Sequence, residues 1–215
     1  MKKELIFDLD GTLLNTIFDI ADAMNYALDV YNYPPNTDED YVKYIGDGIY
    51  ELVVRAIHNP NVDEKTVLEI LKIYENRYHQ ISCNRTRPFD NMKEVLLELK
   101  RRGYELSVIS NKPDYDSNIL INYFFPKIFK YVVGSKADVK RKPSTMPMDI
   151  FLKKYNLTKD DIIYIGDSRV DARFSENIGC EYYLFEHGYE NKQLLHSFNP
   201  KAFLKNAKDL LDVLK

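Results

Sequence analysis

The sequence predicts an α/β fold, in which helices cover a parallel sheet that is interrupted early by an all-helical segment. Short apolar runs alternate with helical patterns over most of the chain, whereas residues 16–84 carry helical patterns with no convincing strand. Alternating strands and helices are typical of a parallel sheet with helices on both faces. The length of 215 residues suits one large domain or one domain with an insertion.

The first predicted strand is the apolar run Leu5–Phe7, which is too short for a helix and is followed by acids and a glycine. Three further strands are predicted at residues 105–109, 131–133 and 162–165. Helices are predicted at 91–102, which Gly103 ends, and from about 150 towards Leu157. The tail from 202 to 215 is expected to form a short strand or turn and a closing helix.

The helical insert follows directly after the first strand. Apolar residues recur there at helical spacing, as in Ile20, Ala23, Met24, Ala27 and Leu28. We therefore predict a core domain formed by residues 1–15 and 85–215, and a helical domain formed by residues 16–84.

Composition excludes several classes of function. The 30 basic and 33 acidic residues give a net charge of -3 without long blocks of one sign, so nucleic acid is not expected as a partner. Apolar runs are too short to cross a membrane, and the N-terminus lacks the pattern of a signal peptide, so a cytoplasmic protein is expected. Cys83 and Cys180 are read as ordinary reduced thiols. The sequence does not indicate an oligomeric state.

Polar side chains follow the predicted strands where ligands bind in parallel sheets. Asp8 and Asp10 come after the first strand, and the period of two points both carboxylates to one side. An isolated pair of this kind is usually a solvated acidic turn. The functional interpretation therefore depends on the other strand ends.

Three more groups follow later strands, and they are Ser110 with Asn111, then Lys142, then Asp167 with Asp171. Each alone has a simple explanation as a turn, a basic loop or a helix cap. A hydroxyl and an amide can hydrogen-bond an anionic oxygen, a lysine can neutralise a phosphate, and paired acids can hold a hard cation. Their order predicts one site with a metal, a nucleophile and phosphate-binding groups.

These motifs resemble those of the haloacid dehalogenase superfamily, in its phosphoglycolate phosphatase and β-phosphoglucomutase-like branch. The resemblance rests on residues 7–13, Ser110-Asn111-Lys112-Pro113, Lys142-Pro143 and Gly166-Asp167-Ser168 with Asp171. It implies a Rossmann-like parallel sheet core with an all-helical cap inserted after the first strand. The chain departs from its relatives at Asn15, where an acid is common, and at residues 144–147.

The resemblance also implies roles for the site residues. Asp8 would attack phosphorus and form an aspartyl phosphate, and Asp10 would protonate the leaving oxygen and then activate water. Mg²⁺ would be held by Asp8, the backbone carbonyl of Asp10 and Asp167. Ser110 and Lys142 would hold phosphate oxygens. Asp171 would orient Lys142 or a metal-bound water.

The expected activity is Mg²⁺-dependent hydrolysis of a small phosphorylated metabolite, with phosphoglycolate as the first candidate substrate and pyrophosphate as the second. A sugar-phosphate mutase and a non-enzymatic binding module are the alternatives. In the insert, Gly46 and Gly48 before a predicted helix could bind a compact anion or simply join two helices. The intervening Asp47 argues against a second phosphate site, and Arg55 and Arg77 could face substrate or solvent.

Overall fold

The structure is a computed structural model that describes residues 4–214. The chain forms two compact units, of which one comprises Met1–Asn15 and Pro88–Lys215 and the other Thr16–Arg87. The chain crosses between them at β2 (Leu14–Asn15) and β3 (Arg87–Pro88), which form a separate two-stranded sheet.

The core unit contains the predicted parallel sheet. Its six strands lie in the order β5-β4-β1-β6-β7-β8, and all neighbours are parallel. The strands are β1 (Glu4–Phe7), β4 (Glu105–Pro113), β5 (Tyr131–Ser135), β6 (Ile162–Gly166), β7 (Glu181–Phe185) and β8 (Ala202–Leu204). The sequence prediction missed β7, although its run of aromatic and apolar residues is typical of a strand.

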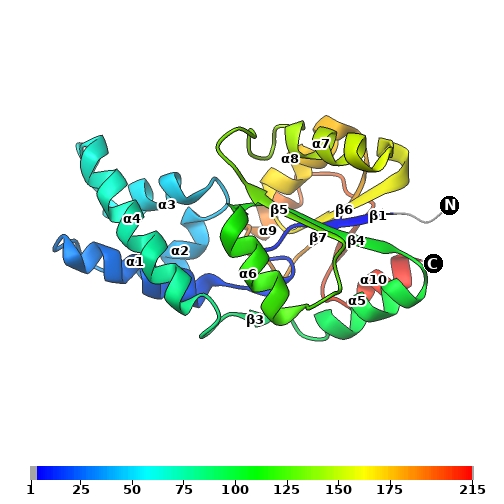
Figure 1. Cartoon of the computed structure of the whole chain (residues 1–215), viewed down its shortest axis with the longest axis horizontal. Helices are drawn as coiled ribbons and strands as arrows, with labels where there is room; N and C mark the ends of the chain where they lie inside the picture. Colours follow the sequence, from blue (N-terminus) through cyan, green and yellow to red (C-terminus); the bar gives the residue numbers. More distant parts are fainter. Residues whose placement is uncertain (1–3, 215) are drawn as a thin grey trace. The chain divides into compact units, whose positions relative to one another are not determined.

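Helices cover both faces of this sheet (Figure 1), with α7 and α8 on one face and α5 and α10 on the other. The helices are α5 (Met92–Arg101), α6 (Asp114–Phe124), α7 (Met146–Tyr155), α8 (Arg169–Ile178), α9 (Lys192–Leu195) and α10 (Asp209–Val213). In α5 the predicted apolar face is buried, with Met92, Val95, Leu96 and Leu99 turned inward. The α/β fold class is thus confirmed.

A packed apolar core fixes the strands that end at the site. Ile6 of β1, Ile109 of β4 and Tyr164 of β6 belong to one buried cluster, together with Phe151 of α7 and Phe174 of α8. Phe7 pairs in register with Val108 on one side and with Ile165 on the other. The three central strands therefore place their carboxyl ends side by side.

The second unit is helical, with α1 (Ile17–Val30), α2 (Asp38–Tyr44), α3 (Ile49–Ile57) and α4 (Glu64–Ile81). Thr37 caps α2 in a capping box, and Asp63 caps α4. The unit extends to Arg87 rather than to the predicted residue 84. The reason is that the buried Asp19 of α1 accepts hydrogen bonds from the backbone amides of Arg85 and Thr86.

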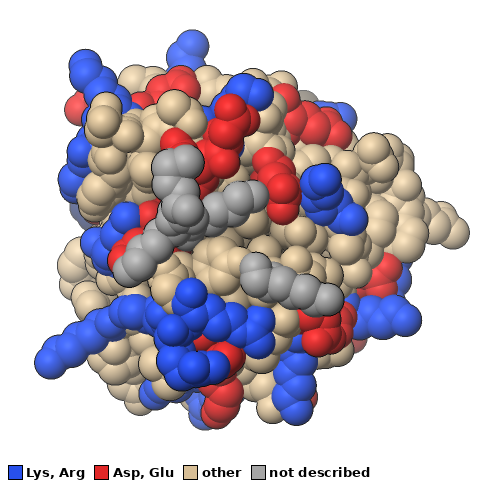
Figure 2. All heavy atoms as spheres, turned by 90° about the vertical axis from the view of Figure 1, so that its right-hand side faces the viewer, with Lys and Arg blue, Asp and Glu red and all other residues tan. Residues whose placement is uncertain are grey.

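The surface of the core unit carries charges of both signs, as the composition predicts. Figure 2 shows acidic and basic side chains intermingled on the face of the core unit that it presents. Among residues 4–214, no helix combines the length and the apolar character that a membrane span requires.

Candidate active site

The loop that carries Asp8, the predicted nucleophile, begins where β1 ends. The backbone amide of Asp8 donates a hydrogen bond to the Ile165 carbonyl of β6 at 2.9 Å. Asp8 therefore lies at the carboxyl end of β1, beside β6. The chain then turns at Gly11, whose φ of +83° favours glycine. This turn directs Thr12 back towards the loop that follows β6.

The Lys142 ammonium contacts three side chains of the site. It lies 2.9 Å from Oδ1 of Asp8, 2.7 Å from Oδ1 of Asp171 and 2.8 Å from the hydroxyl oxygen of Tyr164. The Lys142 side chain is 1% exposed. The ammonium donates hydrogen bonds to Tyr164 and Asp171, and its contact with Asp8 is an ion pair. Burial opposes its charge, but Asp171 and Asp8 outweigh burial and raise the pKa of Lys142 above its ordinary value.

Asn111 holds the backbone of Lys142. The Asn111 amide nitrogen donates to the Lys142 carbonyl at 3.0 Å, and its amide oxygen accepts from the Lys142 amide at 2.8 Å. The sequence predicts that this amide binds substrate, which stays a prediction. In the structure, the Asn111 side chain links the end of β4 to the loop that carries Lys142. The peptide bond between Lys142 and Pro143 is cis.

Ser110 and Lys112 lie where β4 loses its regular register. Pairing between β4 and β5 shifts between Ile109 and Pro113, a type of irregularity that often redirects side chains beside active sites. The buried Lys112 places its ammonium 3.2 Å from Oδ1 of Asp10. Lys112 therefore holds the predicted acid/base, a role that the sequence analysis did not assign.

Asp171 is satisfied by its own loop and by Lys142. Its Oδ2 accepts from the backbone amides of Asp167 and Ser168 and from the Ser168 hydroxyl, at 3.2, 3.1 and 2.6 Å. Ser168 in turn caps α8. Burial raises the pKa of Asp171, but Lys142 and these donors outweigh it, so that the pKa lies below its usual value. The structure thus confirms the capping interpretation for Ser168, and the functional interpretation of this motif stays a prediction.

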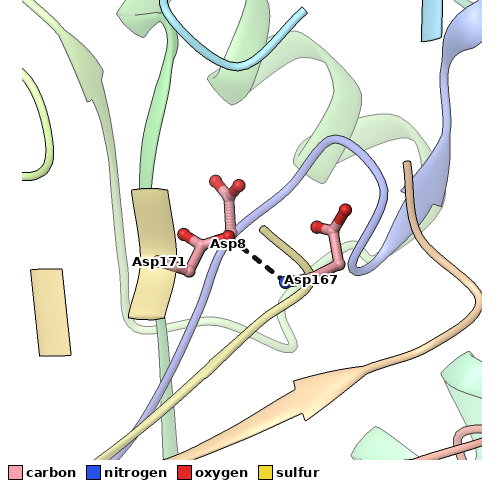
Figure 3. A group of neighbouring side chains, drawn as sticks. All are labelled: Asp8, Asp167 and Asp171. Carbon is pink, nitrogen blue, oxygen red and sulfur yellow. Dashed lines mark hydrogen bonds between the residues drawn. The ribbon is translucent and has the colours of Figure 1, made fainter. Parts of the chain in front are cut away.

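Figure 3 shows Asp8, Asp167 and Asp171 grouped at the strand ends, with the Asp167 amide bonded to Asp171. One carboxylate oxygen from each lies within 4.8 Å of the others. The cluster takes in the side chain of Asp171 and leaves out that of Asp10. The use of the Asp10 backbone carbonyl as a metal ligand stays a prediction.

The buried cluster carries more negative than positive formal charge. Burial raises the pKa of Asp8 to about 6, with Lys142 lowering it and Asp171 raising it. Burial, Asp171 and Asp8 raise the pKa of Asp167 well above its ordinary value. Three carboxylates face one ammonium, so their formal charges sum to -2, which a divalent cation would balance. The hard oxygen donors also suit Mg²⁺.

Of the predicted residues of the helical unit, Gly46 and Gly48 lie in the loop before α3, Arg55 lies on α3 and Arg77 lies on α4. Gly46 and Gly48 both have positive φ, at +111° and +97°, and Gly48 precedes α3. Arg55 of α3 pairs with Asp47 at 2.6 Å and also donates to the Tyr44 carbonyl at 2.7 Å. Arg77 lies over the Tyr26 ring. An anion-binding role for the two glycines stays a prediction.

Ligands bind beyond the carboxyl ends of the strands in parallel sheets of this kind, and acids and a lysine clustered there are typical of an α/β enzyme. Residues 5–185 match the family of haloacid dehalogenase-like hydrolases, and the chain belongs to that family. The resemblance predicted from the motifs is thus confirmed, and the chain is a hydrolase of this family.

Named relatives cover nearly the whole chain. It is 27% identical to the phosphoglycolate phosphatase of Vibrio parahaemolyticus over 99% of this chain and 96% of the relative. It is 28% identical to that of Haemophilus influenzae over 97% of this chain and 96% of the relative. A crystal structure titled as a predicted phosphoglycolate phosphatase from Haemophilus somnus has a TM-score of 0.93 at 27% identity, covering 100% of this chain and 98% of that chain.

Proposed function

We propose that this chain is a Mg²⁺-dependent phosphatase that hydrolyses a small phosphate ester such as phosphoglycolate through an aspartyl-phosphate intermediate. The observation that carries the proposal is the position of the Lys142 ammonium, 2.9 Å from Oδ1 of Asp8 and beside the carboxylates of Asp167 and Asp171. Membership of the hydrolase family and the names of the relatives support it.

The metal would be held by Asp8, Asp167 and the backbone carbonyl of Asp10. When bound, Mg²⁺ supplies charge neutralisation, which lets an anionic carboxylate approach an anionic phosphate. Lys142 supplies part of the same neutralisation from the protein side. Asp171 acts through Lys142, because both of its oxygens are engaged by Lys142, Tyr164 and the loop that begins α8.

In the first step, an oxygen of Asp8 attacks phosphorus and the bond from phosphorus to the leaving oxygen breaks. Asp10 gives its proton to that oxygen, so the product leaves as an alcohol. Lys112 is placed to orient Asp10 for this transfer. Ser110 and Lys142 bind the other phosphate oxygens, so catalysis consists largely of positioning and charge neutralisation.

In the second step, water attacks phosphorus and gives a proton to Asp10, while the bond between phosphorus and Asp8 breaks. Inorganic phosphate leaves, and both carboxylates return to their starting states. Asp10 thus serves first as acid and then as base.

The helical unit Thr16–Arg87 is proposed to select the substrate. Backbone amides at Gly46 and Gly48 suit a compact anion such as the carboxylate of phosphoglycolate. The negative charge of Asp47 was an argument against a mutase, but its ion pair with Arg55 weakens that argument. Mutase activity is therefore measured directly in the test.

The test offers phosphoglycolate, pyrophosphate and β-glucose 1-phosphate with a trace of the bisphosphate to the purified full chain with Mg²⁺. Phosphate release and glucose 6-phosphate formation are followed in parallel, with the Asp8→Asn protein as the control for contaminating phosphatases. Fastest phosphate release from phosphoglycolate supports the proposal. Isomerisation with little phosphate release would replace it with a mutase.

A further inference from the structure

Asp167, the proposed metal ligand after β6, is held from outside the site on both carboxylate oxygens. The Thr12 hydroxyl donates to Oδ1 at 2.6 Å, and the backbone amide of Tyr189 donates to Oδ2 at 3.0 Å. Asp167 is buried, with 2% of its surface exposed. Each carboxylate oxygen has two lone pairs, so one acceptor position on each remains available to a cation.

Two glycines close the space around this carboxylate. A Cβ atom at Gly11 would overlap the Asp167 carboxyl group and the Tyr189 ring, and one at Gly188 would overlap the Asp167 side chain. The loop after β1 and the loop after β7 therefore both pack their backbones against Asp167. Little room remains for another side-chain rotamer, because interiors are packed without voids.

Tyr189 connects this support to the point where the chain leaves the core unit. Its hydroxyl donates to Oδ1 of Asn15 in β2 at 3.0 Å. The hydrogen bond spans 174 positions in sequence. One residue thus contacts the metal ligand with its backbone and the crossing strand with its side chain.

We propose that Tyr189 is a positioning residue for the metal site: its amide orients Asp167, and its hydroxyl, held by Asn15, fixes the amide. This inference rests on the proposed function, because it needs Asp167 to be a metal ligand. Groups that orient metal ligands in this way typically change metal affinity when they are removed. Asn15 is uncharged, so it accepts this hydrogen bond without adding charge near the acidic cluster.

The test is Tyr189→Phe, which keeps the ring and the backbone amide and removes only the hydroxyl. Mg²⁺ binding is measured without substrate, by isothermal titration calorimetry and by the Mg²⁺-dependent rise in melting temperature. We expect the dissociation constant for Mg²⁺ to increase roughly tenfold, the low end for loss of such a supporting partner. Tyr183→Phe is the matched control, because its hydroxyl donates to Glu181 on the same strand, away from the site.

A double-mutant cycle with Asn15→Ala tests whether the two side chains act through their hydrogen bond. The double variant should bind Mg²⁺ about as weakly as either single variant, since interacting residues give non-additive effects. Additive effects, or Tyr189→Phe binding Mg²⁺ as the Tyr183→Phe control does, would overturn the inference. If the wild-type chain binds Mg²⁺ but hydrolyses none of the offered esters, the proposed function fails while this test stays valid.

Discussion

Lys142 and Asp171 form an almost fully buried ion pair, with Nζ 2.7 Å from Oδ1 and side-chain exposures of 1% and 0%. The pair joins the loop after β5 to the first turn of α8, two segments that no local sequence pattern connects. Tyr164 donates its hydroxyl to the same Asp171 oxygen at 3.0 Å. The orientation of Lys142 towards Asp8 thus depends on the packing of β6.

Lys142→Met should destabilise the protein and abolish turnover. Removing one partner of a buried ion pair leaves an uncompensated charge, here on both Asp171 and Asp8, at a cost of about 3 kcal/mol or more. Urea unfolding with a chelator present measures this cost without a bound cation. Lys159→Met, which breaks an exposed pair with Asp160, is the control and should change stability by less than about 1 kcal/mol. Equal stability losses in the two variants would show that the buried ion pairs of Lys142 stabilise the protein no more than an exposed pair does.

Asp8→Asn should abolish turnover without unfolding the core. The change is nearly isosteric and removes a carboxylate whose ionised form burial disfavours, as its raised pKa of about 6 indicates. We expect kcat to fall at least about a thousandfold, as for loss of a nucleophile, and the melting temperature in chelator not to decrease. Mass spectrometry of acid-quenched enzyme should show phosphate on the wild-type chain only. Turnover close to wild type would exclude Asp8 as the nucleophile.

The sequence predicted the sheet and the polar residues at its strand ends because both are local patterns. Apolar runs such as Leu5–Phe7 indicate strands by themselves, and the ends of parallel strands converge in any such sheet. The strand β7 was not predicted, because no polar motif follows it as one follows other strands of the sheet. Its aromatic residues Tyr182 and Tyr183 were the available signal.

The resemblance implied that Asp171 orients Lys142, but other contacts that support the site residues could not be predicted, because they depend on three-dimensional packing. Nothing in the spacing of Lys112 indicates that its ammonium reaches Asp10, since the two lie in different loops. The same holds for Tyr189, which reaches Asp167 only because β7 lies beside β6. The sequence thus indicates which groups carry chemistry, and the fold determines which groups hold them.

His187 should make stability depend on pH. Its ring lies between Phe89 and Phe185, at centroid distances of 4.0 and 4.4 Å, and burial lowers its pKa below the ordinary 6.5. The unfolded chain then binds the proton more strongly than the folded one does. Stability is therefore full above the unfolded pKa and decreases as the pH falls through 6.5 towards the lower folded value.

His187→Phe should remove this contribution while keeping the aromatic stack. Melting temperatures measured between about pH 7.5 and pH 5.5 should fall less steeply in the variant than in the wild type. His79→Phe, at an exposed position of α4, is the matched control for replacing a histidine by phenylalanine. Parallel profiles for wild type and His187→Phe would show that the His187 ring does not contribute.

Chelation should remove activity, and Mg²⁺ should restore it. Within residues 4–214, Lys142 is the ammonium paired with the three clustered carboxylates, so added Mg²⁺ should also raise the melting temperature. Ca²⁺ should bind but inhibit, because its larger and looser coordination misplaces the nucleophile. Full turnover in chelator without a divalent ion would contradict the proposed metal dependence.

Arg55→Met should change substrate selection and leave the chemistry of the core intact. Gly46 and Gly48 both have positive φ, a conformation that glycine adopts readily, in the loop between α2 and α3. Arg55 holds it by bonding both the Tyr44 carbonyl and Asp47, and about a third of each charged side chain is exposed. Loss of the pair should therefore cost less than about 1 kcal/mol of stability and still loosen the loop.

We expect the KM for phosphoglycolate to increase about tenfold, because an ordered binding loop contributes to affinity only for substrates that it touches. The value of kcat/KM for the small generic ester p-nitrophenyl phosphate should stay unchanged. Lys65→Met, which breaks the exposed pair with Glu69 on α4, is the control and should alter neither value. Equal losses on both substrates would mean that Arg55 supports catalysis in general. No loss on either would place substrate selection in the loops of the core unit.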